Sequence, residues 1–187
     1  EDVSLVSLKK SQTAEPTVAL DLGRQKLWFA QDDEYRVPKG ATYINFRSPN
    51  VGQSPDQTAA AVLYTELLKD SVNEFAYPAL LAGLSFDLYK HSQGISLRVT
   101  GYNDKQPVLL DRLLAVIKES TFDSLRFTNI QQDMIRSLQN SVAKRPSSQV
   151  IDDMREALLY QEWGEQELIS ALQNIDEQSL RAYINSF

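Results

Sequence analysis

The segment LSFDLYKHSQGISLRVTGY, at residues 84–102, restricts the fold of this chain more than any other feature. It consists of two runs in which apolar and polar residues alternate, joined by a short turn. Every second residue of each run is apolar: Leu84, Phe86 and Leu88 in the first, Ile95, Leu97 and Val99 in the second. A period of two is typical of a half-buried strand, and HSQG supplies turn residues between the runs. The segment therefore predicts an antiparallel hairpin with one buried face.

Three further strands are predicted upstream. TVALDLG and KLWFAQDD flank Gly23 as a hairpin or adjoining strands, and ATYINFRS at 41–48 alternates like the later pair. A capping box then starts a helix, because Ser54 precedes Pro55 and Gln57 stands three residues after Ser54. We expect Pro78 to interrupt this helix and a second short helical piece, PALLAG, to end at Gly83.

The chain after residue 102 is almost wholly helical in pattern. Apolar residues recur at steps of three and four in five segments: 106–120, 124–145 (Phe127, Ile130, Met134, Leu138, Val142), 147–160 (Ile151, Met154, Leu158), 165–173 and 176–185. Strands, then a helical region, then a hairpin and further helices indicate an α+β fold, an antiparallel sheet with helices packed on one face.

The stretch RVTGYNDKQPVLLDRLL at 98–114 joins the last strand to the next helix. Gly101 suits a place where a Cβ would be awkward, Asn103 or Asp104 is expected to cap the helix, and Pro107 fits its first turn. A catalytic interpretation, with Asp104 as acid or base beside Lys105 or Tyr102, would need a pocket and a shifted pKa. Geometry alone accounts for the junction, so the structural interpretation is preferred.

Other candidate catalytic residues are sparse. His91 is the only histidine and falls in a predicted turn, and the chain has no cysteine. A zinc site needs three or four ligands, and a serine triad would have to use His91 without a Gly-x-Ser-x-Gly motif. The acidic pairs in QDDEY (31–35) and IDDMRE (151–156) lack the alternation of a calcium loop. No catalytic, cofactor-binding or metal-binding residue is therefore predicted.

The aromatic residues and the net charge limit the classes of binding partner that the chain is expected to have. Trp28, Phe29 and Trp163 are expected to be packing aromatics rather than a base-stacking platform, because basic neighbours are few. Lys and Arg number 19 against 25 Asp and Glu, which gives 19 − 25 = −6 and argues against nucleic acid. No stretch is apolar enough to span a bilayer, so no membrane partner is predicted.

Three segments carry distinctive motifs in a fixed order: KLWFAQDDEYRVPKG at 26–40, SPDQTAAAVLYTELLKDSVNEFAYPALLAGLSFDL at 54–88 and GISLRVTGYNDKQPVLL at 94–110. Together they resemble the middle region of the insulinase and pitrilysin family of zinc metalloendopeptidases. The resemblance implies the LuxS-like metallohydrolase fold of this family, whose members enclose peptides in a chamber built from four related domains. It identifies the chain as a third, non-catalytic domain, with a lead-in from the preceding half at residues 1–20 and a single domain at 21–187, truncated before its last strand.

The resemblance also places the chemistry outside this segment. In the family, an inverted His-x-x-Glu-His motif of the first domain binds zinc; the corresponding helix here, TAAAVLYTELLKDSVNE, has no histidine. We therefore expect no cofactor in this fragment, zinc in the parent enzyme, other domains of the same polypeptide as partners, and peptide substrates in the parent chamber. A soluble periplasmic location is a family-level expectation.

Two alternatives stay open. The chain could be a freestanding binding or scaffold module that docks a partner through the hairpin edge or a helix face, without a zinc motif elsewhere in the gene product. A carboxylate-dependent hydrolase using Asp32 and Asp33 ranks last, because adjacent residues of a strand point to opposite faces.

Overall fold

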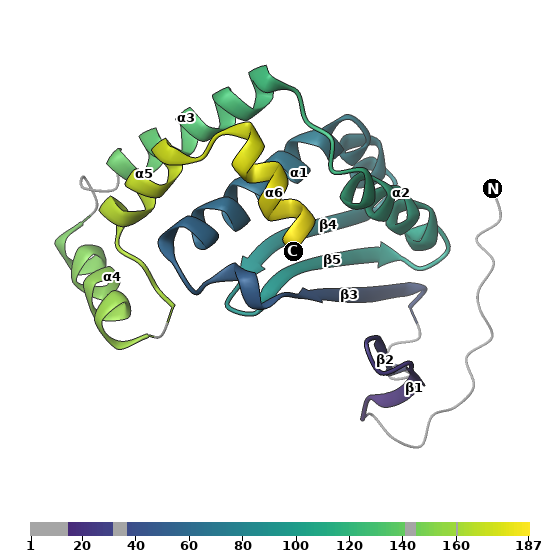
Figure 1. Ribbon diagram of the computed structural model, residues 1–187. Helices are drawn as coiled ribbons and strands as arrows, with labels where there is room; N and C mark the ends of the chain where they lie inside the picture. Colours follow the sequence, from purple (N-terminus) through teal and green to yellow (C-terminus); the bar gives the residue numbers. More distant parts are fainter. Residues whose placement is uncertain (1–14, 32–36, 141–144, 160) are drawn as a thin grey trace.

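A computed structural model describes residues 15–31, 37–140, 145–159 and 161–187 (Figure 1). The strands are β1 (Thr17–Asp21), β2 (Lys26–Phe29), β3 (Lys39–Arg47), β4 (Leu84–His91) and β5 (Gly94–Tyr102). A 3-10 helix, η1 (Pro49–Val51), precedes six α-helices: α1 (Pro55–Leu81), α2 (Gln106–Glu119), α3 (Ser124–Asn140), α4 (Pro146–Leu158), α5 (Glu165–Asn174) and α6 (Glu177–Ser186). The predicted α+β class is confirmed.

The predicted hairpin of residues 84–102 is formed by β4 and β5, and β3 pairs with the other edge of β5. All three strands are antiparallel, in the order β3-β5-β4. The apolar set of both hairpin strands faces the helices, and five of its members are almost fully buried: Leu84, Leu88, Ile95, Leu97 and Val99. Burial on one face fixes the register, since a slip by one residue would turn this set to solvent.

Helix α1 begins where the sequence predicts. The Ser54 hydroxyl accepts the Gln57 N–H at 3.2 Å, and Pro55 occupies the first turn. The Gln57 side chain accepts the Gln53 N–H rather than that of Ser54, so the return bond of the capping box is displaced by one residue.

The expected interruption at Pro78 is wrong. Helix α1 continues through Pro78 to Leu81, and Gly83, with φ +76°, follows its end. Proline lacks the N–H that would bond to the carbonyl of residue 74, and its ring crowds that carbonyl, but its own carbonyl still accepts the Ala82 N–H at 3.1 Å. One lost hydrogen bond near a helix end is tolerated when the helix is held elsewhere by packing.

Helix α1 is the centre of the core. It packs on β4 and contacts α2, α3, α5 and α6, so apolar residues around most of its circumference are buried: Ala59, Ala60, Ala61, Leu63, Tyr64, Leu67, Leu68 and Val72. No helix in the described ranges is both long and apolar enough to cross a membrane. The predicted helices at 165–173 and 176–185 are confirmed as α5 and α6.

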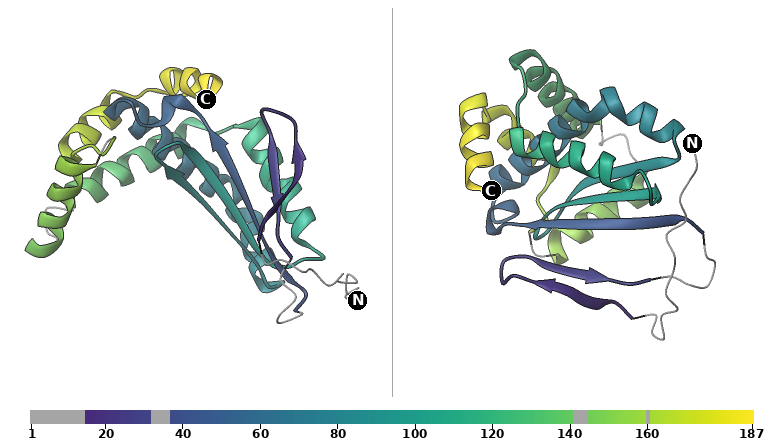
Figure 2. Two further views of the ribbon diagram at one scale, coloured as in Figure 1. Left: turned by 90° about the horizontal axis from the view of Figure 1, so that it is seen from below. Right: turned by 90° about the vertical axis from the view of Figure 1, so that its right-hand side faces the viewer.

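The hairpin of β1 and β2 forms a separate two-stranded sheet. In Figure 1 and the right view of Figure 2 it runs below β3, whereas most of the helices lie above the three-stranded sheet and α4 lies to one side of it in Figure 1. Residues 1–20 were expected to be a lead-in. Of these, residues 1–14 lie outside the described residues, and residues 17–20 belong to β1. Val142, predicted on the α3 stripe, also lies outside the described residues.

Candidate functional site

The strand-to-helix junction is built on two glycines. Gly101 has φ +127°, and a Cβ on it would lie 2.9 Å from Cα of Leu84 and closer still to the carbonyl oxygen of Gly83. Gly83 has φ +76°, and a Cβ there would lie 2.7 Å from the ring of Tyr102. Side chains of other residues are excluded by both conformation and space, as predicted for Gly101.

The predicted caps of α2 are wrong. Lys105 is the N-cap residue and makes no side-chain cap bond, while the Asp104 carboxylate pairs with the Lys105 ammonium at 3.3 Å. The Asn103 N–H instead donates to the Pro38 carbonyl at 3.1 Å, which ties the junction to the start of β3. The Asn103 Oδ1 atom is buried without a hydrogen-bond partner in the described residues. A long-range main-chain bond thus takes the place of a local cap.

The Gln106 side chain, at the start of α2, connects this helix to β3 and to the end of β5. Its Nε2 donates to the carbonyls of Gly40 (2.6 Å) and Gly101 (2.8 Å), and its Oε1 accepts from the Thr42 hydroxyl at 3.3 Å. The residue is only 7% exposed. Gln131 does the same in the helical layer, donating to the carbonyls of Leu172 and Ile175 at 2.7 Å each. No local pattern marks either residue, because every partner except Gly101 is 41 to 66 positions away in the sequence.

The junction does not have the geometry of a catalytic centre. The Lys39 ammonium lies 5.4 Å from the Tyr102 ring centroid, and Lys105 is 59% exposed in its ion pair with Asp104. Cavities of about 520 Å³ and 570 Å³ are lined by other residues. The first lies between α2, α6 and the sheet, and the second lies between α1, α3 and α5. The structural interpretation of the junction is therefore preferred.

His91 ends β4 at the turn, close to the position predicted for it. Its Nδ1 accepts the Gln93 N–H at 3.2 Å, and its Nε2 is buried without a hydrogen-bond partner in the described part of the chain. Burial, helped by the positive charges of Arg47 and Lys90, lowers the pKa of His91. The lowered pKa favours the neutral form of the imidazole at this turn.

The acidic pairs do not form a metal site in the described chain. Asp32 and Asp33 lie outside the described residues, while Asp152 and Asp153 lie on α4. Across residues 15–31, 37–140, 145–159 and 161–187, no three His, Cys, Asp or Glu side chains are grouped closely enough to hold a metal ion. The described residues therefore do not fit a resident zinc ion.

Two of the three aromatic residues expected to pack do not pack within the described chain. Trp28 and Phe29 are 57% and 58% exposed, because no layer of the described structure covers β2. The Lys26 ammonium lies 5.8 Å from the Trp28 ring centroid. A cation–π contact at such an exposed site stabilises the ring less than burial in a hydrophobic core would. Trp163 is half-buried as expected, and its Nε1 donates to the Gly52 carbonyl at 3.2 Å.

The β1–β2 hairpin is apolar on both faces. Val18 pairs across the strands with Trp28, and Leu20 pairs with Leu27 after a register shift. Neighbouring residues of a strand point to opposite faces, so Trp28 lies with Val18, whereas Leu27 lies with Phe29. All five side chains are 45–58% exposed. A two-stranded ribbon of this kind is marginal alone in water and calls for cover on both sides.

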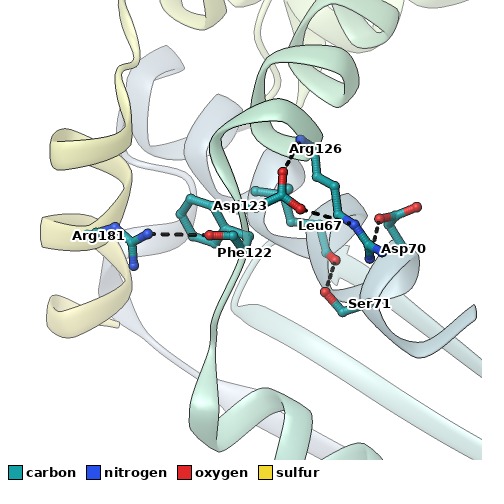
Figure 3. Close-up of polar contacts among 7 residues, drawn as sticks. All are labelled: Leu67, Asp70, Ser71, Phe122, Asp123, Arg126 and Arg181. Atoms are coloured by element: carbon teal, nitrogen blue, oxygen red, sulfur yellow. Dashed lines mark hydrogen bonds and ion pairs between the residues drawn. The ribbon is translucent and has the colours of Figure 1, made fainter. Parts of the chain in front are cut away.

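A polar network joins three helices on the opposite part of the molecule (Figure 3). The Arg126 guanidinium lies 3.1 Å from the Asp70 carboxylate of α1 and 3.3 Å from that of Asp123, just before α3. The Arg181 guanidinium of α6 lies 4.5 Å from the Phe122 ring centroid and donates to the Phe122 carbonyl at 3.4 Å. The network holds the α2–α3 connection in place and is a structural feature.

Comparisons with known proteins assign this architecture. Residues 1–171 match the family model described as the middle or third domain of peptidase M16. The chain is 39% identical over 180 residues to the insulin-degrading enzyme of Homo sapiens, covering 96% of this chain and 18% of that protein. The match covers nearly all of this chain but only a small part of the relative.

Two solved structures share the fold. Pitrilysin superposes with a TM-score of 0.84 at 19% identity, over 100% of this chain and 20% of that one. The periplasmic protease PqqL from Escherichia coli gives 0.50 at 15% identity, over 79% of this chain and 17% of that one. In each case the matched chain is about five times or more the length of the aligned domain.

Proposed function

The chain belongs to the family of the middle or third domain of peptidase M16, and from this premise we propose that it is a non-catalytic wall domain of a larger zinc metallopeptidase. Hydrolysis of enclosed peptides, with zinc bound by another domain, would be the activity of the whole protein. This chain's own residues would shape the chamber and contact the other domains. We assign no catalytic or metal-binding residue to it.

The observation that carries this proposal is the β1–β2 hairpin, whose two faces expose five large apolar side chains. A domain that worked alone would leave this apolar surface in water, at the cost of the hydrophobic free energy that its burial would provide. A domain inside a larger enzyme can cover both faces with its neighbours. The insulin-degrading enzyme has the additional length for such neighbours, since the matched region is 18% of it.

We also propose that a later strand completes the domain, whereas the boundary expected between residues 20 and 21 falls inside β1, which pairs with β2. Strand β3 pairs with β5 on one edge only, and the β1–β2 hairpin runs beyond its other edge (Figure 2, right). The Asn50 amide donates to the Ser186 carbonyl at 3.0 Å, so α6 ends beside the C-terminal end of β3. A strand after α6 could therefore run antiparallel to β3 and protect its open edge.

The test is peptide hydrolysis by the full-length product of the same gene and by residues 1–187. We expect the full-length protein to cleave peptides, to lose activity with a chelator and to regain it with zinc, and the 187-residue chain to be inactive and free of stoichiometric zinc. Zinc binding or hydrolysis by the 187-residue chain would overturn the proposal. An inactive full-length protein without the inverted zinc motif would favour the freestanding binding module. Fractionation of the source cells tests the periplasmic location that the family resemblance predicts.

A further inference from the structure

The cavity of about 520 Å³ between α2, α6 and the three-stranded sheet has no part in the proposed function. Its size is within the range of cavities that hold small ligands, whose walls are mostly apolar with a few placed polar groups. The apolar part of this wall is formed by large side chains from α1, the sheet and both helices: Phe46, Leu68, Ile95, Ile117, Ile184 and Phe187. The polar residues of the wall therefore indicate which ligand fits.

Two hydroxyl groups lie in the wall where α1 meets the end of α2. Tyr64 is only 5% exposed, and its Oη lies 2.7 Å from the Oγ of Ser120; both hydroxyls can donate to the Ile117 carbonyl. Burial raises the pKa of Tyr64 more than the hydrogen bond with Ser120 lowers it, so the phenol stays protonated. These hydroxyls also satisfy the end of α2, which is a structural role, but they add no negative charge to the cavity.

The charged residues of the wall make it locally basic in an acidic chain. They are Lys118, Glu119 and Arg181, which gives 2 − 1 = +1, whereas the whole chain carries −6. Lys118 has no ion-pair partner among the described residues, and adjacent helix residues such as Lys118 and Glu119 do not face each other. Arg181 contacts the Glu177 carboxylate (3.9 Å) and the Phe122 carbonyl (3.4 Å) through Nη2 alone. Two cationic groups at this wall thus retain free donors.

We infer that this cavity is a binding site for a small carboxylate with an apolar body. The apolar body lies against the apolar wall, and the carboxylate accepts hydrogen bonds from Lys118 and Arg181, which are at the exposed side of the cavity. Such charge-assisted bonds are stronger than bonds between neutral groups. The inference does not depend on the proposed function, because it concerns binding by residues of this chain.

Calorimetric titration of the full-length product of the same gene with decanoate tests the inference. We expect decanoate to bind at one site, and decyltrimethylammonium, which has the same apolar chain and the opposite charge, to bind at least about tenfold more weakly, because like charges repel at the wall. Equal binding of the two amphiphiles would overturn the inference, since any exposed apolar surface would then account for it. Failure of decanoate to bind the full-length protein would also overturn it, because other parts of the protein would then fill the cavity.

Hydrogen–deuterium exchange locates the bound decanoate. We expect it to slow exchange in α6 and at the end of α2, because a ligand suppresses local opening where it binds, and to leave α4 and the β1–β2 hairpin unchanged. Protection confined to other elements would overturn the inference, whether or not the protein hydrolyses peptides.

A pair of lysine substitutions on α2 tests the carboxylate contact. Lys118→Gln is expected to weaken decanoate binding about threefold or more, as an exposed ionic contact allows. Lys105→Gln is the matched control: Lys105 is 59% exposed at the other end of α2, and its loss should leave the affinity unchanged. Lys118 is also exposed, so neither change threatens the fold. Equal losses in the two variants would indicate general attraction of anions and would overturn the inference.

Discussion

A Cβ atom on Gly101 would lie against the main-chain carbonyl oxygen of Gly83, closer than van der Waals contact permits. This relationship joins the end of α1 to the end of β5 and leaves no room for a side chain, and φ +127° adds strain for any residue with a Cβ. We expect Gly101→Ala to lower the free energy of unfolding by about 3 kcal/mol, measured by urea denaturation. Gly52→Ala is the control. Gly52 has φ −146°, and the three atoms nearest to an added Cβ all belong to the flexible Gln161 side chain, so this substitution should cost less than about 1 kcal/mol. Equal effects would show that the junction tolerates a side chain.

Gln106 provides a second test of the junction. Gln106→Ala removes the Nε2 donor from the carbonyls of Gly40 and Gly101 in a site that is 7% exposed. Because the buried groups would lose partners, we expect a loss of about 2 kcal/mol in the free energy of unfolding. Gln132→Ala, the same change at an exposed position of α3, should be almost neutral. A neutral Gln106→Ala would mean that water replaces the amide.

Pro78 allows a stabilising substitution. Since α1 runs through this position, Pro78→Ala restores the missing N–H to the helix. We expect thermal or urea unfolding to show a gain of about 1 kcal/mol, less than in a helix centre because Pro78 is near the end and because alanine makes the unfolded chain more flexible. Pro55→Ala, in the first turn, should give no gain. Destabilisation by Pro78→Ala would indicate that the ring itself is packed in a way that alanine cannot replace.

The two arginines of Figure 3 should respond differently to salt. Arg126 is 45% exposed in its ion pairs, so Arg126→Ala is expected to cost at most about 1 kcal/mol at low salt and almost nothing at 1 M NaCl. Arg181→Lys keeps the charge but loses the planar stacking on Phe122, and its cost of about 0.5–1 kcal/mol should persist in salt. If both losses disappeared together in salt, stacking would contribute nothing at Phe122.

The lowered pKa of His91 predicts how the free energy of unfolding changes with pH. Burial and the charges of Arg47 and Lys90 lower its pKa in the folded chain, so below its ordinary pKa the unfolded chain binds more protons. The contribution of His91 to stability should therefore be present near pH 7 and be lost as the pH falls through its unfolded and then its folded pKa. His91→Gln should flatten this part of a stability curve measured from pH 7 to pH 5. An unchanged slope would assign it to other groups.

The sequence by itself determined the elements whose signals are local. The period of two and the turn HSQG specify the β4–β5 hairpin, Ser54 and Pro55 specify where α1 begins, and Gly101 marks the tight junction. Each signal acts between residues a few positions apart, which is why it can be read without a fold. The ordered motifs, from KLWFAQDD to GYNDK, also indicated the family.

Only the tertiary structure decided the features that depend on remote neighbours. Gln106 bonds to Thr42 across 64 positions, and such a pairing cannot be seen in a local window. Trp28 is exposed because no layer lies over β2, although its type suggests a core. Helix α1 passes through Pro78 because its earlier turns are packed against β4 and other helices, and α4 exposes its large apolar residues. An apolar pattern shows that a surface is to be buried, but the path of the rest of the chain decides whether this domain or a neighbour buries it.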